Sequence, residues 1–283
     1  MDAWAEYYWP DSDVLKNKAG LKTAAGLRAF EYEATRLRAE QLRAQPIAGN
    51  FDTTHYRAIH RHLFQDVYAW AGEYRRIDFT KGRASFALVS TPTDTLATWG
   101  ERILGELADE RQFKGLRKGA FVVRLAHHYG ALNFWHPMRE GNGRATKEFL
   151  VQLAKQAGYE LAFERIGAKA WNTAAERQIA DHDSQRVIAA FDKIATPARA
   201  VAFRDEAIAA AVATFPELRG AADMLAAAHR KAAAKYDAGS ARVFVAGIHA
   251  KLFERLAQGE VVAPRRVDPP TAIQDDAYTR EGR

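Results

Sequence analysis

A polar, glycine-rich stretch between two apolar segments decides how this chain is interpreted. It reads His136-Pro137-Met138-Arg139-Glu140-Gly141-Asn142-Gly143-Arg144. The spacing of apolar residues predicts a buried helix over residues 117–134 before it and another helix over residues 144–157 after it. Glycine lets the backbone turn tightly and approach a ligand closely. We therefore expect two helices joined by a corner that can hold a small molecule.

The corner combines groups that suit a polyphosphate. The backbone N–H groups of Gly141, Asn142 and Gly143 fall at the start of the second helix, where free donors and the helix dipole attract anions. Arg144 in the first turn and Lys147 in the next add two cations on nearly the same face. A simpler alternative is a capped turn in which the glycines only make the corner. The two cations favour the anion site.

Two more side chains of the corner suit chemistry on a nucleotide. Glu140 offers carboxylate oxygens, and Mg²⁺ is usually held by one or two carboxylates plus phosphate oxygens. His136 titrates near neutrality and can act as a general base. A base, a metal carboxylate and a phosphate cradle are what transfer from a nucleotide requires.

The stretch resembles the signature of the Fic family, His-Pro-Phe-x-Asp/Glu-Gly-Asn-Gly-Arg-x-x-Arg. Two other segments are similar to bacterial Fic toxins in the same order along the chain: residues 8–18 (YWPDSDVLKNK) resemble their opening, and residues 58–73 (AIHRHLFQDVYAWAGE) resemble the segment before their flap. The resemblance covers roughly residues 5–195. It implies an all-α Fic-type domain with one β-hairpin flap, and the activity of a protein adenylyltransferase that moves AMP from ATP to a Tyr, Ser or Thr hydroxyl of a target protein.

The resemblance also implies a role for each residue of the corner. His136 would deprotonate the target hydroxyl, and Glu140 would hold Mg²⁺. Residues 141–143 would form an anion hole, with Asn142 at the α-phosphate. Arg144 would contact the phosphates that leave as pyrophosphate.

Two positions depart from the family signature. Met138 stands where the family has a buried Phe, and because Met is apolar and adaptable we expect the loop to keep its place. Lys147 stands where the family has its final Arg. Lysine keeps the positive charge but loses the two-pronged fork of a guanidinium. We therefore expect weaker control of the triphosphate, with altered nucleotide use or low activity as open alternatives.

Residues 76–89 change from helical to alternating periodicity. Strands are predicted at residues 76–79 and 85–89, joined by a turn at residues 80–83. An isolated hairpin is marginally stable, so it must lean on the rest of the protein, either as a surface decoration or as a flap over a site. The resemblance implies a flap that binds the target by strand addition. Lys81 and Gly82, in its turn, would approach the nucleotide.

Three regions are predicted along the chain. Residues 1–197 form the Fic-type domain, with a boundary at Thr196-Pro197. Residues 198–263 form an accessory helical extension with a break at Gly239-Ser240, and residues 264–283, rich in proline at their start, form a flexible tail. His127 and His128 lack the carboxylate spacing of a metal motif and are interpreted as structural.

Composition sets the broad class. The chain has 283 residues, of which 48% are hydrophobic and 27% charged, as in folded globular proteins. No stretch approaches the roughly 20 apolar residues that cross a bilayer, no secretory signal is visible at the start, and cysteine is absent. We expect a cytoplasmic protein that does not bind membranes. The net charge of +6 is spread along the chain, so we do not expect direct nucleic-acid binding.

The family's inhibitory helix has the pattern Ser/Thr-x-x-x-Glu-Gly/Asn. The two Glu-Gly pairs of this chain, at residues 140–141 and 281–282, have His136 and Ala277 four positions earlier. The chain thus lacks this pattern, and the resemblance implies the toxin of a toxin–antitoxin pair with a separate small antitoxin. The family expectation for the target is a type II topoisomerase subunit. The alternatives are a degenerate, non-catalytic Fic domain, a basic nucleic-acid-binding module, or a related Fic/Doc transferase with another nucleotide donor.

Overall fold

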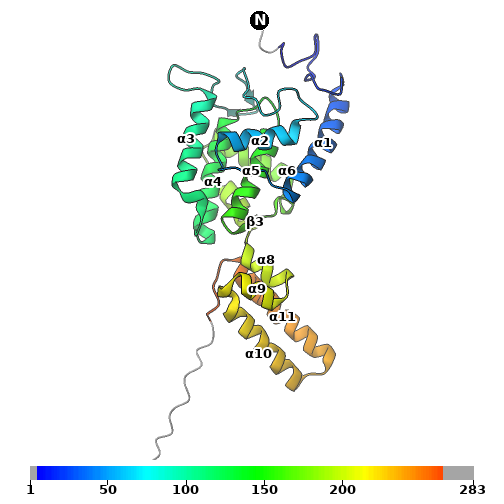
Figure 1. Ribbon diagram of the computed structural model, residues 1–283, viewed down its shortest axis with the longest axis vertical. Coiled ribbons are helices and arrows are strands. Elements are labelled where there is room, and N and C mark those ends of the chain that lie inside the picture. Colours follow the sequence, from blue (N-terminus) through cyan, green and yellow to red (C-terminus); the bar gives the residue numbers. More distant parts are fainter. Residues whose placement is uncertain (1–4, 264–283) are drawn as a thin grey trace, which may run out of the picture. The chain divides into compact units, whose positions relative to one another are not determined.

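The computed structural model describes residues 5–263, so the tail predicted at residues 264–283 lies outside the described part. The chain forms two compact units that divide at residue 198 (Figure 1). The described residues are mostly helical and hold two short strand pairs, which confirms the all-α prediction. None of the helices within residues 5–263 is long and apolar enough to cross a bilayer.

The first unit is a bundle in which α4 and α5 run through the middle, flanked by α1 and α3 (Figure 1). Its helices are α1 Ala24–Ala44, α2 Thr53–Phe64, α3 Leu96–Asp109, α4 Lys118–Trp135, α5 Asn142–Gln156, α6 Ala168–Ala180 and α7 Gln185–Ile194. Side-chain oxygens of Thr23, Asp52 and Thr95 cap the first three by accepting from backbone N–H groups of the first turn.

Helix α4 is the centre of the core. It packs against α3, α5, α6 and α7, and its apolar residues point to several sides rather than one, as expected of a helix buried all round. Trp135, in its last turn, is fully buried, and its indole N–H donates to the carbonyl oxygen of Leu96 at 2.6 Å. Core packing therefore fixes the end of α4, where the corner that leads to α5 begins.

The β-hairpin is shorter than the sequence predicted. Its strands are β1 Thr80–Lys81 and β2 Ala84–Ser85, antiparallel with Thr80 opposite Ser85. The strands predicted at residues 76–79 and 85–89 were wrong in extent because the buried guanidinium of Arg75 takes their carbonyl groups. It donates to the carbonyl oxygen of Ile77 at 2.7 Å and to that of Ala87. These segments are thus bonded to a side chain instead of to each other.

A second strand pair was not predicted. Strands β3 Tyr159–Leu161 and β4 Ala195–Pro197 pair antiparallel, with Glu160 opposite Thr196. Each strand is only three residues long, and the partners lie far apart in sequence, so no local alternation marks them. The predicted boundary at Thr196-Pro197 therefore falls in β4, next to the division between the two units at residue 198.

The second unit has its own helices and its own core. The helices are α8 Ala198–Asp205, α9 Ile208–Thr214, α10 Arg219–Lys235 and α11 Ala238–Ala257, and Phe203, Leu218 and Leu256 are fully buried among them. The helix break predicted at Gly239-Ser240 exists but lies slightly earlier, because α10 ends at Lys235 and α11 begins at Ala238. The Asp237 carboxylate accepts from the N–H groups of Gly239 and Ser240 at 2.9 and 3.0 Å, so both lie in the first turn of α11.

Candidate active site

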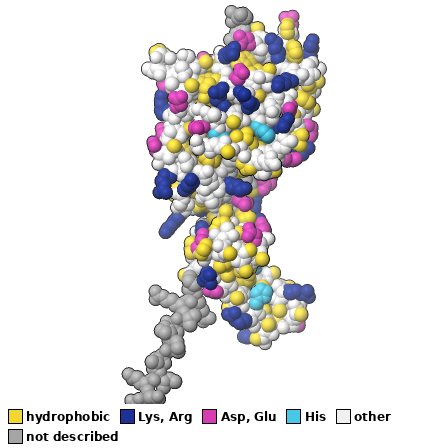
Figure 2. All heavy atoms as spheres, viewed as in Figure 1, with side chains coloured by type: hydrophobic (Ala, Val, Ile, Leu, Met, Phe, Trp, Pro, Cys, Tyr) yellow, Lys and Arg dark blue, Asp and Glu magenta, His cyan; other side chains and the backbone are white. Residues whose placement is uncertain are grey.

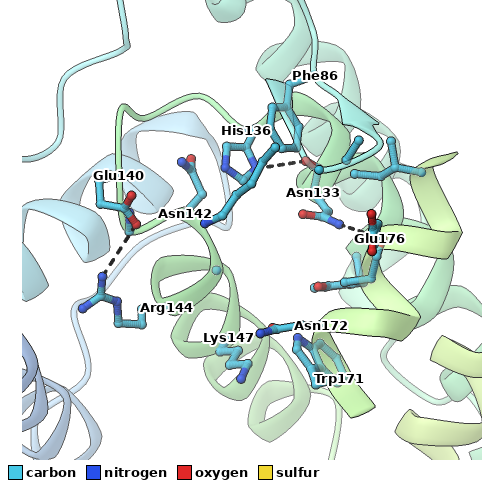
Figure 3. Close-up of a pocket in the computed structure, with 18 residues that line it drawn as sticks. Phe86, Asn133, His136, Glu140, Asn142, Arg144, Lys147, Trp171, Asn172 and Glu176 are labelled. Atoms are coloured by element: carbon cyan, nitrogen blue, oxygen red, sulfur yellow. Dashed lines mark hydrogen bonds and ion pairs between the residues drawn. The ribbon is translucent and has the colours of Figure 1, made fainter. Parts of the chain in front are cut away.

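A cavity of about 440 Å³ opens at the corner between α4 and α5 (Figure 3). Residues of the hairpin, the corner and one face of α6 line it. It brings together every residue that the sequence placed in the site: Lys81, Gly82, His136, Glu140, Gly141, Asn142, Gly143, Arg144 and Lys147. The lining residues that the sequence did not place in the site include Phe86, Asn133, Trp171 and Glu176.

His136 sits at the C-terminal end of α4 in the left-handed conformation, with φ 42° and ψ 56°. Its imidazole stacks on the ring of Phe86, with the ring centroids 3.8 Å apart. The Nδ1 atom lies 3.2 Å from the carbonyl oxygen of Asn133. A carbonyl oxygen only accepts, so Nδ1 carries the proton and Nε2 keeps its lone pair.

The surroundings of His136 keep its imidazole neutral. Burial, aided by the nearby Lys81 charge, lowers its pKa to about 4. The imidazole is therefore neutral at pH 7. With Nδ1 donating to Asn133, the Nε2 lone pair is able to take a proton from an incoming hydroxyl.

Gly141 makes the turn into α5. Its φ of 84° is the left-handed region that glycine favours, and an added Cβ would fall 2.2 Å from the ring of Phe64. Helix α5 begins directly after it, and no side chain caps this end. The first backbone N–H groups of α5 thus face the cavity region with the positive end of the helix dipole, which suits an anion.

The side chain of Asn142 holds the loop itself. Its Oδ1 accepts from the N–H of Met138 at 2.8 Å, and its Nδ2 donates to the carbonyl oxygen of Met138 at 2.7 Å. Both Asn142 and Met138 are buried, and Met138 fills the place where the signature has Phe. A phosphate that reaches Asn142 would therefore meet its backbone N–H, because the amide side chain is already bonded.

Arg144 is held from a direction that the sequence did not reveal. Its guanidinium donates to the carboxylate of Glu31, on α1, and to the hydroxyl of Thr35 at 3.3 Å. It also lies over the ring of Phe64, 4.6 Å from the centroid. Glu31 accepts a further hydrogen bond from the hydroxyl of Tyr68. Helix α1 thus orients a side chain of the corner.

His60, on α2, fixes the backbone of the corner. It is fully buried, its Nδ1 accepts from the N–H of Gly72 at 3.0 Å, and its Nε2 donates to the carbonyl oxygen of Glu140 at 2.8 Å. Burial lowers the pKa of His60 to about 4, so His60 is a neutral imidazole when it donates to the carbonyl oxygen of Glu140.

Lys147 lines the cavity beside Trp171 (Figure 3). Its Nζ lies 5.3 Å from the ring centroids of both Phe163 and Trp171, and burial lowers its pKa. Within residues 5–263 no carboxylate forms an ion pair with it. Its charge is therefore available to an anion in the cavity.

The hairpin is fastened to α6. Arg83 forms two hydrogen bonds with the carboxylate of Asp181, at 2.9 and 3.0 Å, and its backbone N–H donates to Glu176 at 3.1 Å. Gly82 lies so close to Glu176 that an added Cβ would be 2.9 Å from the carboxylate oxygen. The hairpin is thus a wall of the cavity and not a surface decoration.

Glu140 is the carboxylate of the corner that could bind a metal ion; the other carboxylate that lines the cavity, Glu176, accepts from the backbone N–H of Arg83. Glu140 is half-buried, lines the cavity, accepts from the N–H of Gly141 at 2.9 Å and lies 3.8 Å from Arg144. The described residues contain no cluster of three acidic, His or Cys side chains that could hold a metal alone. His128 instead contacts Glu110 at 3.1 Å. One carboxylate beside a phosphate cradle fits a Mg²⁺ ion that shares its ligands with a nucleotide.

Comparisons with known proteins agree with this geometry. The model of the Fic/DOC family matches residues 50–154. A probable protein adenylyltransferase Fic of Salmonella typhimurium is 34% identical over 193 residues, which cover 68% of this chain and 93% of that protein. The chain belongs to the Fic/DOC family. Another probable protein adenylyltransferase Fic, from Escherichia coli K12, is 36% identical over 168 residues, covering 59% of this chain and 81% of that protein.

Solved structures of the Fic/DOC family share the fold. The Fic domain of a Bartonella quintana effector with bound ADP has 27% identity and a TM-score of 0.62, covering 68% of this chain and 94% of that one. BepC of Bartonella tribocorum with bound AMPPNP has 28% identity and the same TM-score, covering 68% and 96%.

Proposed function

We propose that this chain is a protein adenylyltransferase that moves AMP from ATP to a hydroxyl side chain of another protein. One observation carries the proposal. A neutral imidazole whose Nδ1 is bonded to Asn133 lines the same cavity as the uncapped start of α5. Relatives of the chain are named protein adenylyltransferases, and two structural neighbours hold ADP and AMPPNP.

In this proposal the first unit binds ATP with its phosphates at the start of α5. The N–H groups of Asn142 and Gly143, with Arg144 and Lys147, bind the phosphate oxygens. Glu140 would be the protein ligand of a Mg²⁺ ion, which supplies charge neutralisation for the phosphates when bound.

The transfer itself uses His136 as the base. Its Nε2 accepts the proton of the target hydroxyl as that oxygen forms a bond to the α-phosphorus. The bond between the α-phosphorus and the bridging oxygen to the β-phosphate breaks, and pyrophosphate leaves. The cations around it offset the charge that develops on the leaving phosphates.

We also propose how the chain meets other proteins. An extended target segment would add to the hairpin, and the resemblance to bacterial Fic toxins makes a type II topoisomerase subunit the first candidate. A separate small antitoxin in the cytoplasm would restrain the enzyme. Two observations support it: the ammonium group of Lys147 lies near the rings of Phe163 and Trp171 with no acidic partner among the described residues, and the sequence lacks the inhibitory pattern.

Labelling with ATP tests the proposed activity. The full chain is incubated with Mg²⁺, a bacterial lysate, and ATP labelled on the α-phosphate or on the γ-phosphate. We expect label on a lysate protein from α-labelled ATP only, and its loss in His136→Ala. Label from γ-labelled ATP would indicate phosphate transfer instead. Salt-sensitive nucleic-acid binding without labelling would favour a binding module instead. The visible face of the first unit does not point to one, because acidic and basic side chains are interspersed over it (Figure 2).

A further inference from the structure

A second cavity, of about 310 Å³, meets the first one at the proposed base. Tyr8, Phe79, Thr80, Lys81, His136, Arg139 and Glu140 line it. Three of these residues, Lys81, His136 and Glu140, also line the larger cavity. Its volume is at the lower end of the roughly 300 to 1,000 Å³ that is typical of ligand sites, so it has room for a side chain rather than for a nucleotide.

Strand β1 forms one border of this second cavity, through Thr80 and Lys81. Its partner β2 packs against α6, so β2 separates β1 from that helix. The sheet of the hairpin has only these two strands within the described residues, which leaves the other edge of β1 unpaired. An extended segment of a target protein that pairs with this edge of β1 would run along the second cavity, and one of its side chains would enter that cavity.

Arg139 supplies a fixed positive charge in the same cavity. Its guanidinium carbon lies 5.3 Å from the ring centroid of Tyr8 and 5.2 Å from that of Phe79, and the guanidinium donates to the Tyr8 hydroxyl. Tyr8 is itself placed by a backbone bridge to Leu15. A guanidinium is always charged and has five N–H donors, so Arg139 can attract and bind a carboxylate while it keeps its contacts with the protein.

We infer that the second cavity is the acceptor subsite, and that Arg139 favours targets with an acidic side chain next to the modified hydroxyl. This rests on the proposed transfer to a protein. The hydroxyl would reach His136 from the second cavity while the nucleotide fills the first. A neighbouring Asp or Glu of the same segment would lie beside Arg139. Arg139 touches the target and not the reacting atoms, so it determines specificity.

Peptide binding without ATP tests this inference. Two dye-labelled peptides share one central tyrosine; its neighbours are aspartates in one and lysines in the other. Fluorescence anisotropy is measured at low salt with the wild-type chain, Arg139→Glu, Arg139→Gln and the control Arg219→Glu. Arg219 is exposed on α10 in the second unit, so its reversal changes the net charge equally.

We expect the wild-type chain and Arg219→Glu to bind the aspartate peptide at least about tenfold more tightly than the lysine peptide. Arg139→Gln should lose this preference and Arg139→Glu should reverse it. Equal binding of both peptides, no binding of either, or a preference that survives in Arg139→Glu would overturn the inference. Because the peptide assay contains no ATP, its outcome is independent of the labelling assay. Labelling of lysate proteins without the peptide preference would overturn this inference and leave the proposed function intact. The peptide preference without labelling would count against the proposed function.

Discussion

The Nδ1 atom of His136 lies 3.2 Å from the carbonyl oxygen of Asn133, three positions earlier on α4. This carbonyl lies in the last turn of α4, and Pro137, four residues after Asn133, has no N–H to donate to it. The same unsatisfied group that ends α4 therefore sets the tautomer of the proposed base. The chemistry of the site thus depends on the way in which a helix stops.

The pH profile of transfer should reflect the low pKa of His136. Burial lowers that pKa to about 4, so the base stays neutral in mild acid. We expect kcat/KM of the free enzyme to fall less than about twofold from pH 8 to 5.5, whereas a base of pKa about 6.5 would lose about tenfold. Rates of AMP transfer from labelled ATP, measured across this range, check the prediction, and a tenfold loss would contradict it.

The free energy of unfolding should depend on pH through His60. The pKa of this buried side chain is lowered to about 4, so between pH 4 and 6.5 the unfolded chain binds a proton that the folded chain does not. Stability therefore rises with pH in this window by about 1.4 kcal/mol per unit for this group. His60→Phe should be less stable, yet show a shallower slope in urea unfolding at several pH values. An unchanged slope would remove His60 as its source.

Removing the charge of Glu31 should weaken the handling of ATP. In Glu31→Gln the guanidinium of Arg144 loses the nearer of its two carboxylate partners, the other being Glu140 at 3.8 Å. A hydrogen bond to a charged group is worth about 1.5 to 3 kcal/mol, so we expect kcat/KM for ATP to fall about 10- to 100-fold. Tyr68→Phe, which removes the other contact of the same carboxylate, should have a smaller effect. Equal losses in both variants would indicate general disruption instead of orientation of Arg144.

Lys147→Arg should increase the affinity for ATP. The described structure gives Lys147 no carboxylate partner, and a guanidinium can bind two phosphate oxygens and stack on the rings of Phe163 and Trp171. We expect KM for ATP to fall about threefold, with Lys147→Met raising it at least tenfold (about 1.4 kcal/mol). Steady-state kinetics at saturating target measure both. A higher KM in Lys147→Arg would show that the slot between the rings is too narrow.

Exchanging the charges of Arg83 and Asp181 should test whether this ion pair holds the hairpin against α6. Arg83 and Asp181 are both partly exposed, 60% and 40%, so solvent screens their charges and the pair should contribute little to stability. Arg83→Asp and Asp181→Arg should each raise KM for ATP a few-fold at low salt, and the double variant should restore it. A double variant no better than the single ones would mean that the pair does not hold the hairpin.

The sequence predicted the corner well and its surroundings poorly, for a physical reason. Glycines, charges and the helix ends of residues 136–147 are local, so their chemistry can be inferred from spacing. Glu31, His60 and Phe86 reach the corner only because tertiary packing brings their helices and the hairpin there. Their own neighbourhoods carry no signal of that contact. The strands beside Arg75 failed likewise, because a buried side chain replaced a backbone ladder.

The paired hydrogen bonds between Asn142 and Met138 have a thermodynamic consequence. They close the loop into a ring that already has its final shape, so the entropy of ordering it is lost when the protein folds. An arriving ligand has no loop to organise, and more of its contact energy remains as affinity. Substitutions that remove these hydrogen bonds would leave the loop flexible in the free protein. The ligand would then have to order the loop as it binds, and its affinity would fall.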